Sequence, residues 1–289
     1  MKRGQHIAVE QFANLRQRIG EVARDRERLG LDIDFMRAAM ARVMARLVLG
    51  VVAALALGAC QTVRTTQGGV VGVDRAQTMS PLVSSAQVDK MSLQQYNTTV
   101  ADAENKGKLN RDPQQVKRVR GIGQRLIAQT GTFRPDARNW QWEINVITSD
   151  ELNAWCMPGG KIAVYTALIE RLQLTDGELA AVMGHEISHA LREHSREKMS
   201  KAVPAQVLMS VVGVAYGDGA AQLGGQAYQL LVGLPNSREM ETEADRMGVE
   251  LMARAGYDPA ASVSVWRKMQ QAAKGQTPQF LSTHPSNET

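Results

Sequence analysis

The sequence is short of cysteine, of long apolar runs and of internal repeats. Its only two cysteines, Cys60 and Cys156, cannot build a scaffold of several disulfides. The apolar run at residues 47–59 has 13 residues, whereas a transmembrane helix needs about 20. No repeat period is present, so we expect no appended helical-repeat domain. The 289 residues are 44% hydrophobic, which is enough for one domain with a substantial core behind a leader.

Most of the net charge of +5 lies near the N-terminus. Residues 1–59 hold 10 Lys or Arg and 6 Asp or Glu, which leaves 24 basic and 23 acidic residues in the rest of the chain. That remainder is nearly neutral, and its charge argues against a nucleic-acid partner.

The first 59 residues have the pattern of an export leader. Arginines precede the apolar run and Cys60 follows it directly, in the order of the n-region and h-region of a secretory signal. Residues 57–60, LGAC, resemble a bacterial lipobox, which predicts cleavage before Cys60 and lipidation of its side chain. We therefore expect a bacterial outer-membrane lipoprotein that faces the periplasm and contacts the membrane through its N-terminal lipid. An uncleaved anchor is the alternative.

Two further expectations concern the N-terminal region. Residues 1–35 are charged in a way that signal peptides are not, so we expect translation to start further downstream, with a cytoplasmic extension as the alternative. Residues 60–85 are rich in Thr, Gln, Ser, Val and Gly without a helical period. This composition predicts a lipid-tethered linker.

The most informative stretch is residues 179–191, LAAVMGHEISHAL, which contains an HExxH motif. His185 and His189 are spaced i, i+4, so on a helix both imidazoles lie on one face and can share one metal ion. Glu186 is offset by one position and can reach a water at the metal without binding the metal, as the general base of metal-assisted hydrolysis must. The surrounding apolar residues predict a buried helix over residues 174–195.

Two histidines leave a zinc site incomplete, because catalytic zinc usually has three protein ligands. The extended motif HExxHxxGxxH is excluded, since Arg192 and Ser195 occupy the positions of its glycine and third histidine. His194 lies five residues after His189, about 140° away around a continuous helix. We therefore expect His194 at the surface.

A carboxylate from a second helix is the other source of a third ligand. Glu241 and Asp245 are spaced i, i+4, so both can face the site, one as metal ligand and the other as a partner of a ligand. Glu239 and Glu243 are the alternatives on the same stretch.

Four ordered blocks of sequence resemble the HtpX-like and CAAX-prenyl-protease-like zinc metallopeptidases of peptidase family M48. They are the HEISH motif, the ExxxD pattern from Glu241 to Asp245, NAWCMPGGKIAVYTALI at residues 153–169, and STHP at residues 282–285. The resemblance implies a mostly helical α+β fold of the zincin type, with a small β-sheet beside the active-site helix. We expect this zinc metallopeptidase domain to span residues 86–289.

The same resemblance implies roles for individual residues. One Zn²⁺ per chain would be bound by His185, His189 and Glu241, and Asp245 would orient a ligand histidine. The segment that contains Asn153, Pro158, Gly159 and Gly160 would pair with the extended main chain of a substrate, because strand addition recognises backbone without particular side chains. A structural hairpin is the alternative for that segment.

His284 lies on a stretch that is predicted to be a loop, where a histidine usually faces solvent. Relatives carry the same THP block, and the open fourth position on zinc is a place where another imidazole can bind. We therefore expect His284 to approach the metal, either as a latch that displaces water or as a hydrogen-bond donor to the oxyanion.

Together these patterns predict a zinc-dependent metalloendopeptidase that hydrolyses peptide bonds with a water that zinc acidifies and Glu186 deprotonates. The family resemblance implies that its substrates are misfolded or misassembled cell-envelope proteins. The alternative is a zinc-stabilised periplasmic chaperone or assembly lipoprotein without proteolysis. That alternative would keep the ligands and lose the base, and Glu186 is present.

Overall fold

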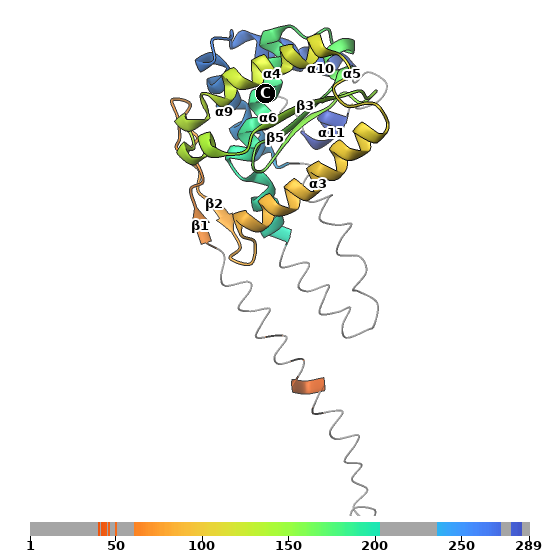
Figure 1. Ribbon diagram of the computed structural model, residues 1–289. Coiled ribbons are helices and arrows are strands. Elements are labelled where there is room, and N and C mark those ends of the chain that lie inside the picture. Colours follow the sequence, from red (N-terminus) through yellow and green to blue (C-terminus); the bar gives the residue numbers. More distant parts are fainter. Residues whose placement is uncertain are drawn as a thin grey trace, which may run out of the picture. The chain divides into compact units, whose positions relative to one another are not determined.

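A computed structural model of the protein describes residues 61–202, 236–272 and 279–284, together with single residues between 40 and 50. Residues 1–55 and 56–289 cluster as two compact units, and the strands and helices labelled in Figure 1 belong to the second. This unit is mostly helical with two small sheets, which confirms the predicted α+β class.

Several sequence-based expectations fall outside the described residues. Cys60, the predicted lipidation site, is one of them, as is the charged stretch at residues 1–35, after which we expect translation to start. Within the described ranges, no helix combines the length and the apolar character that crossing a membrane requires.

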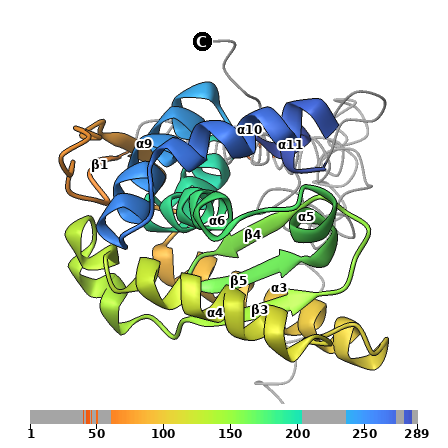
Figure 2. The same ribbon diagram turned by 90° about the horizontal axis from the view of Figure 1, so that it is seen from above.

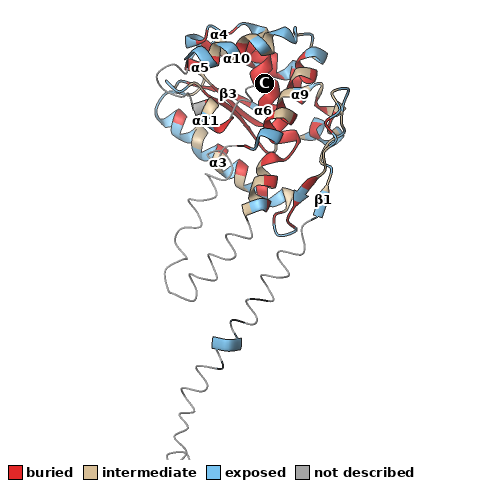
Figure 3. Cartoon of the chain, turned by 180° about the vertical axis from the view of Figure 1, so that it is seen from behind, coloured by how far each residue is buried: buried red, intermediate tan, exposed pale blue. Residues whose placement is uncertain are grey.

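Helix α6 (Asp176–Leu191) forms the centre of the fold. It begins with a capping box, in which the Thr175 hydroxyl accepts a hydrogen bond from the backbone N–H of Glu178 while the Glu178 carboxylate accepts one from the N–H of Thr175. From Leu179 to Leu191 every residue is buried, and Figure 3 shows this helix as buried along its length. A helix buried on all sides needs neighbours all round.

A three-stranded sheet lies beside α6. Its strand order is β3 (Glu143–Ile147), β5 (Lys161–Tyr165), β4 (Ala154–Met157), with β3 parallel and β4 antiparallel to β5. Strand β4 is the edge strand next to α6, as Figure 2 shows. In the turn between β4 and β5, Gly160 has φ of 84° and a Cβ there would lie 2.7 Å from the Trp142 ring, so only glycine fits.

The remaining helices cover the sheet and α6. Helix α4 packs on β3 and α6, α3 contacts β4, and α9 and α10 pack against α6 on the side away from the sheet (Figure 2). Their bounds are Ser85–Asn105 for α3, Pro113–Ile127 for α4, Thr166–Arg171 for α5, Arg238–Arg254 for α9, Ala260–Ala272 for α10 and Gln279–Thr283 for α11, with short 3₁₀ helices at Thr130–Thr132 and Pro135–Asn139.

The N-terminal segment differs from the predicted linker. Strands β1 (Gln61–Val63) and β2 (Gln77–Met79) pair antiparallel, and we call residues 61–79 the N-terminal hairpin. Gln77 is fully buried, and its side-chain amide donates to the backbone carbonyl of Arg192 at 2.7 Å. The prediction of a tether over residues 60–85 is therefore wrong for this segment, because it forms a hairpin whose Gln77 and Arg75 side chains hydrogen-bond to the domain.

Candidate metal centre

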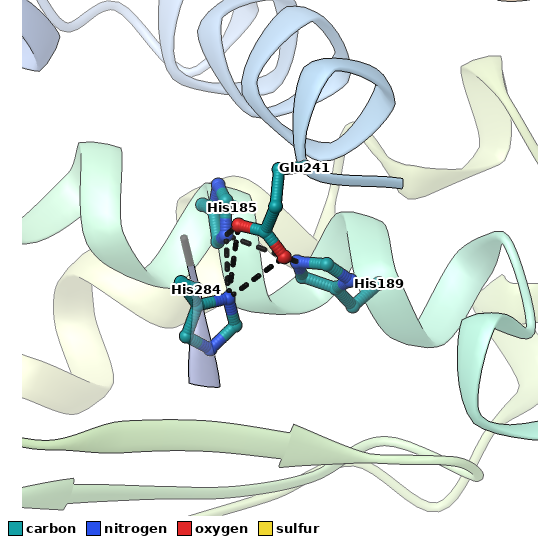
Figure 4. Close-up of side chains that lie close together, drawn as sticks. All are labelled: His185, His189, Glu241 and His284. Atoms are coloured by element: carbon teal, nitrogen blue, oxygen red, sulfur yellow. Dashed lines mark hydrogen bonds and ion pairs between the residues drawn. The ribbon is translucent and has the colours of Figure 1, made fainter. Parts of the chain in front are cut away.

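Four side chains, from helices α6 and α9 and from the residue after α11, converge beside the sheet (Figure 4). The Nε2 atoms of His185 and His189 are 3.0 Å apart, and the Glu241 carboxylate lies 3.3 Å from the first and 3.4 Å from the second. His284 Nδ1 lies 3.2 Å from His185 Nε2 and 3.1 Å from Glu241 Oε2. All four residues are buried, and their donor atoms lie within 4.8 Å of one another.

Helix α9 brings Glu241 to the cluster because it crosses α6 very closely. Gly248 lies at the crossing, where a Cβ would be 2.8 Å from the backbone nitrogen of His185. Gly184 on α6 faces the same point, and a Cβ there would be 3.0 Å from the Gly248 carbonyl oxygen. Glu241, Asp245 and Gly248 follow the i, i+4, i+7 pattern of one helix face, so the crossing points both acids toward α6.

The acidic side chains of α9 have different partners. The Asp245 carboxylate lies 2.8 Å from His185 Nδ1, so in the neutral ring that nitrogen carries the proton and Nε2 has the lone pair that can bind a metal. Glu239 is exposed and lies near Arg75, whereas the Glu243 carboxylate faces His194 at 3.0 Å. Glu241 is thus the acid of α9 that reaches both motif histidines.

Glu186 faces the cleft next to the cluster. Its side chain is buried and accepts a hydrogen bond from the backbone N–H of Cys156 on β4. Its Oε1 atom lies 3.3 Å from His284 Nε2 without the geometry of a hydrogen bond, and within the described residues it has no hydrogen-bond partner. Burial raises the pKa of this carboxyl group.

The electrostatics of the cluster suit a cation. Burial opposes a charge on His185, but the Asp245 and Glu241 carboxylates outweigh it and raise the pKa of this histidine well above its usual value. Burial also opposes a charge on Glu241, yet hydrogen bonds with His185 and His284 lower its pKa. Burial lowers the pKa of His189. The buried carboxylates thus favour a positive charge at this position. Two imidazoles and a carboxylate are a donor set that suits a divalent metal ion.

His194 is not at the surface, and this prediction is wrong. Helix α6 ends at Leu191 instead of continuing to Ser195, and Glu193 adopts the left-handed region with φ of 53°. The chain therefore turns back, and the fully buried His194 places its Nδ1 2.8 Å from Nδ1 of His189. A helical wheel could not show this, because it assumes a continuous helix.

A cleft opens beside the cluster. One wall is residues 153–157, which include β4, and the other walls carry Glu186, His284 and Lys198. Burial lowers the pKa of Lys198 to about 8. Of the predicted substrate segment, Asn153 lines the cleft, whereas Pro158, Gly159 and Gly160 form the turn after β4 and lie outside the cleft lining. The prediction of the substrate segment took Asn153 and the residues of this turn together and did not single out β4 as the part that lines the cleft.

Comparison with known proteins shows the family of this fold and site. The profile of peptidase family M48 matches residues 113–289. Mitochondrial metalloendopeptidase OMA1 of Arabidopsis thaliana is 38% identical over 145 residues, 50% of this chain and 29% of that protein. The Schizosaccharomyces pombe protein of the same name is 37% identical over 178 residues, 58% of this chain and 49% of that protein. The beta-barrel assembly-enhancing protease of Escherichia coli K12 is 27% identical over 189 residues, 62% of this chain and 38% of that protein.

These comparisons also correct one expectation. The relatives at 37–38% identity are named as mitochondrial proteins, which contradicts the predicted location of a bacterial outer-membrane lipoprotein. The chain spans less than half the length of the relatives named above. With a family profile that covers more than half of its residues and the HExxH motif inside that match, this chain belongs to peptidase family M48 and carries a metalloendopeptidase domain of that family.

Proposed function

We propose that the protein is a zinc-dependent metalloendopeptidase that hydrolyses peptide bonds of misfolded or misassembled proteins. The observation that carries the proposal is the convergence of two imidazole nitrogens and the Glu241 carboxylate within 3.4 Å of one another, beside a cleft that the buried Glu186 lines. Such a site combines a metal position with a separate base, as hydrolysis of an amide requires.

Each group has a distinct task in this proposal. His185, His189 and Glu241 would hold the ion, and Asp245 would fix the tautomer of His185. When bound, Zn²⁺ supplies Lewis acidity, which polarises the scissile carbonyl and makes water more acidic. Glu186 takes the proton of the attacking water and donates it to the leaving amine. The raised pKa of Glu186 suits this exchange near neutral pH.

Strand β4 supplies the binding surface for a substrate main chain. It is an edge strand of its sheet and one wall of the cleft. An extended peptide that adds to this edge would be bound through backbone hydrogen bonds, so its side chains would matter less than its lack of structure. Unfolded or misassembled proteins offer such segments. The name of the Escherichia coli relative, a beta-barrel assembly-enhancing protease, also supports this substrate class.

His284 acts as a resting-state latch in this proposal. Its Nδ1 lies among the donor atoms, 3.2 Å from His185 Nε2, which is where a fourth ligand would lie. The same imidazole stands between Glu186 and the cluster, with Nε2 3.3 Å from Glu186 Oε1. Substrate and water would reach the site only after His284 withdraws.

The test uses the purified full-length protein and one substrate protein in two forms, native and unfolded. Zinc content is measured by atomic absorption, and cleavage is followed by gel and mass spectrometry. We expect about one zinc per chain and internal cleavage of the unfolded form. If the protein binds zinc, suppresses aggregation of the unfolded form and cuts neither form, the chaperone alternative replaces the proposal.

A further inference from the structure

Two buried acids near the metal centre share one arginine from a distant part of the chain. Arg75, in the N-terminal hairpin, donates from Nε to Glu243 Oε1 at 2.6 Å and from Nη2 to Glu243 Oε2 at 3.0 Å. Its Nη1 and Nη2 each donate to Glu197 at 2.9 Å. Four charge-assisted hydrogen bonds from one guanidinium fix its orientation strongly. The metal-site residues described above do not include this arginine or explain its position.

A chain of hydrogen bonds connects Arg75 with His189. To present its Nε2 lone pair to the cluster, His189 must carry its proton on Nδ1, and that proton points at His194 Nδ1 at 2.8 Å. His194 then carries its own proton on Nε2 and donates it to Glu243 Oε2 at 3.0 Å. The position of the Glu243 carboxylate therefore sets the tautomer and the orientation of both rings.

The N-terminal hairpin holds the Glu243 carboxylate directly through Arg75 and indirectly through Arg192. Besides Arg75, the Arg192 guanidinium donates to Glu243 Oε2 at 3.0 Å. Arg192 is itself held by the hairpin, since it donates to the Arg75 carbonyl at 3.0 Å and to the Thr66 hydroxyl at 3.1 Å. Both cations that neutralise Glu243 thus depend on residues 61–79, which lie more than 100 positions before His189 in the sequence.

We propose that Arg75 is a positioning residue of the metal centre, so that the N-terminal hairpin sets zinc affinity through Glu243, His194 and His189. The inference rests on the proposed metal site, in which His189 is a ligand. Removing Arg75 takes away one of the two arginines that neutralise the buried Glu243 carboxylate and leaves only Arg192. The Glu243 carboxylate would then shift toward Arg192, and His194 and His189 would lose their fixed orientation.

The first measurement is zinc affinity in the full-length protein, by competition with a chromophoric chelator. We expect Arg75→Gln to weaken zinc binding by about tenfold, the lower end of the range for partners of metal ligands. Arg196→Gln is the matched control, because Arg196 is similarly exposed at 19% against 23% and also holds the N-terminal region, through the Val83 carbonyl, but has no bond to Glu243. The control should bind zinc as the wild type does.

A double-mutant cycle then tests the route. His194→Phe removes the acceptor of His189, so it should weaken zinc binding by itself. Adding Arg75→Gln to His194→Phe should then change zinc affinity little, because the connection is already broken. A further tenfold loss in that background would show that Arg75 acts by another route and would overturn the proposal.

Folding and the parent proposal are separated by two controls. Circular dichroism of the metal-free variants shows whether they fold. If Arg75→Gln does not fold, Arg75→Lys replaces it, because lysine keeps the charge but lacks the planar guanidinium that binds two carboxylates. Arg75→Lys should also weaken zinc binding. If a folded Arg75 variant binds zinc as tightly as the wild type does, only the positioning role of Arg75 is refuted. Failure of the wild type to bind zinc refutes the metal site itself.

Discussion

Glu241 is the residue that distinguishes a three-ligand site from an isolated pair of histidines. Its carboxylate lies 3.3 Å and 3.4 Å from the two motif histidines. We expect Glu241→Ala to weaken zinc binding by more than about 100-fold, because loss of a direct ligand should exceed the 10–100-fold typical of its supporting partners. Cleavage should fall with zinc content.

Glu243→Ala provides a comparison on the same helix for Glu241→Ala. It removes a partner of His194 and not a ligand, so its loss of zinc affinity should be smaller. If zinc content and cleavage both survive in Glu241→Ala, the assignment of the third ligand is wrong.

His284 gives a second prediction at the residue scale, and its direction decides its role. As a latch inside the donor set, His284 slows the enzyme, so His284→Ala should raise the initial rate of cleavage severalfold while zinc stays bound by the other three donors. Steady-state cleavage of a fluorogenic peptide, normalised to zinc content, measures this. A fall of about 100-fold would instead assign His284 to oxyanion stabilisation.

Much of the site could be predicted from residue types and their spacing. His185 and His189 lie one helical turn apart, as do Glu241 and Asp245, so one periodicity predicts both faces. The structure brings these residues together as that reading expects. The position of His194 could not be predicted in this way, because the end of α6 depends on the backbone conformation of Glu193. A hydrophobic pattern does not show that a single residue has a positive φ.

At the scale of helices, the crossing of α6 and α9 positions the acids. A Cβ at Gly248 would meet the backbone of His185 at 2.8 Å, and backbone cannot move aside as a flexible side chain can. We expect Gly248→Ala to separate the helices, to lower the free energy of unfolding by about 1–3 kcal/mol as overpacking does, and to weaken zinc binding. Thermal or urea denaturation and chelator competition measure the two effects.

Gly121→Ala is the matched control for this helix crossing. Gly121 also lies inside a helix, α4, but nothing stands within 4 Å of a Cβ there. Alanine should therefore stabilise the protein by about 0.5–1 kcal/mol through helix propensity and leave zinc binding unchanged. Equal effects of the two substitutions would mean that the close crossing does not position the site.

At the scale of the whole molecule, the hairpin at residues 61–79 shows where composition misleads. Its Thr, Gln and Gly residues are typical of a solvated linker, yet Gln77 hydrogen-bonds to the buried Glu197 and Arg75 to the buried Glu243 on α9. A sequence shows which side chains are polar but not which of them find partners 100 residues away. The α+β fold class, in contrast, could be predicted, because four ordered blocks of sequence resemble peptidase family M48.

The most direct test of the central claim compares wild type with Glu186→Gln in the full-length protein, measuring zinc content and cleavage of an unfolded protein on the same samples. Glu186 is the base in this account, and glutamine keeps its size while losing its ability to accept a proton, so the variant should retain about one zinc per chain and lose nearly all cleavage. Chelation should stop the wild type and added Zn²⁺ should restore it. Undiminished cleavage by zinc-loaded Glu186→Gln would contradict the account.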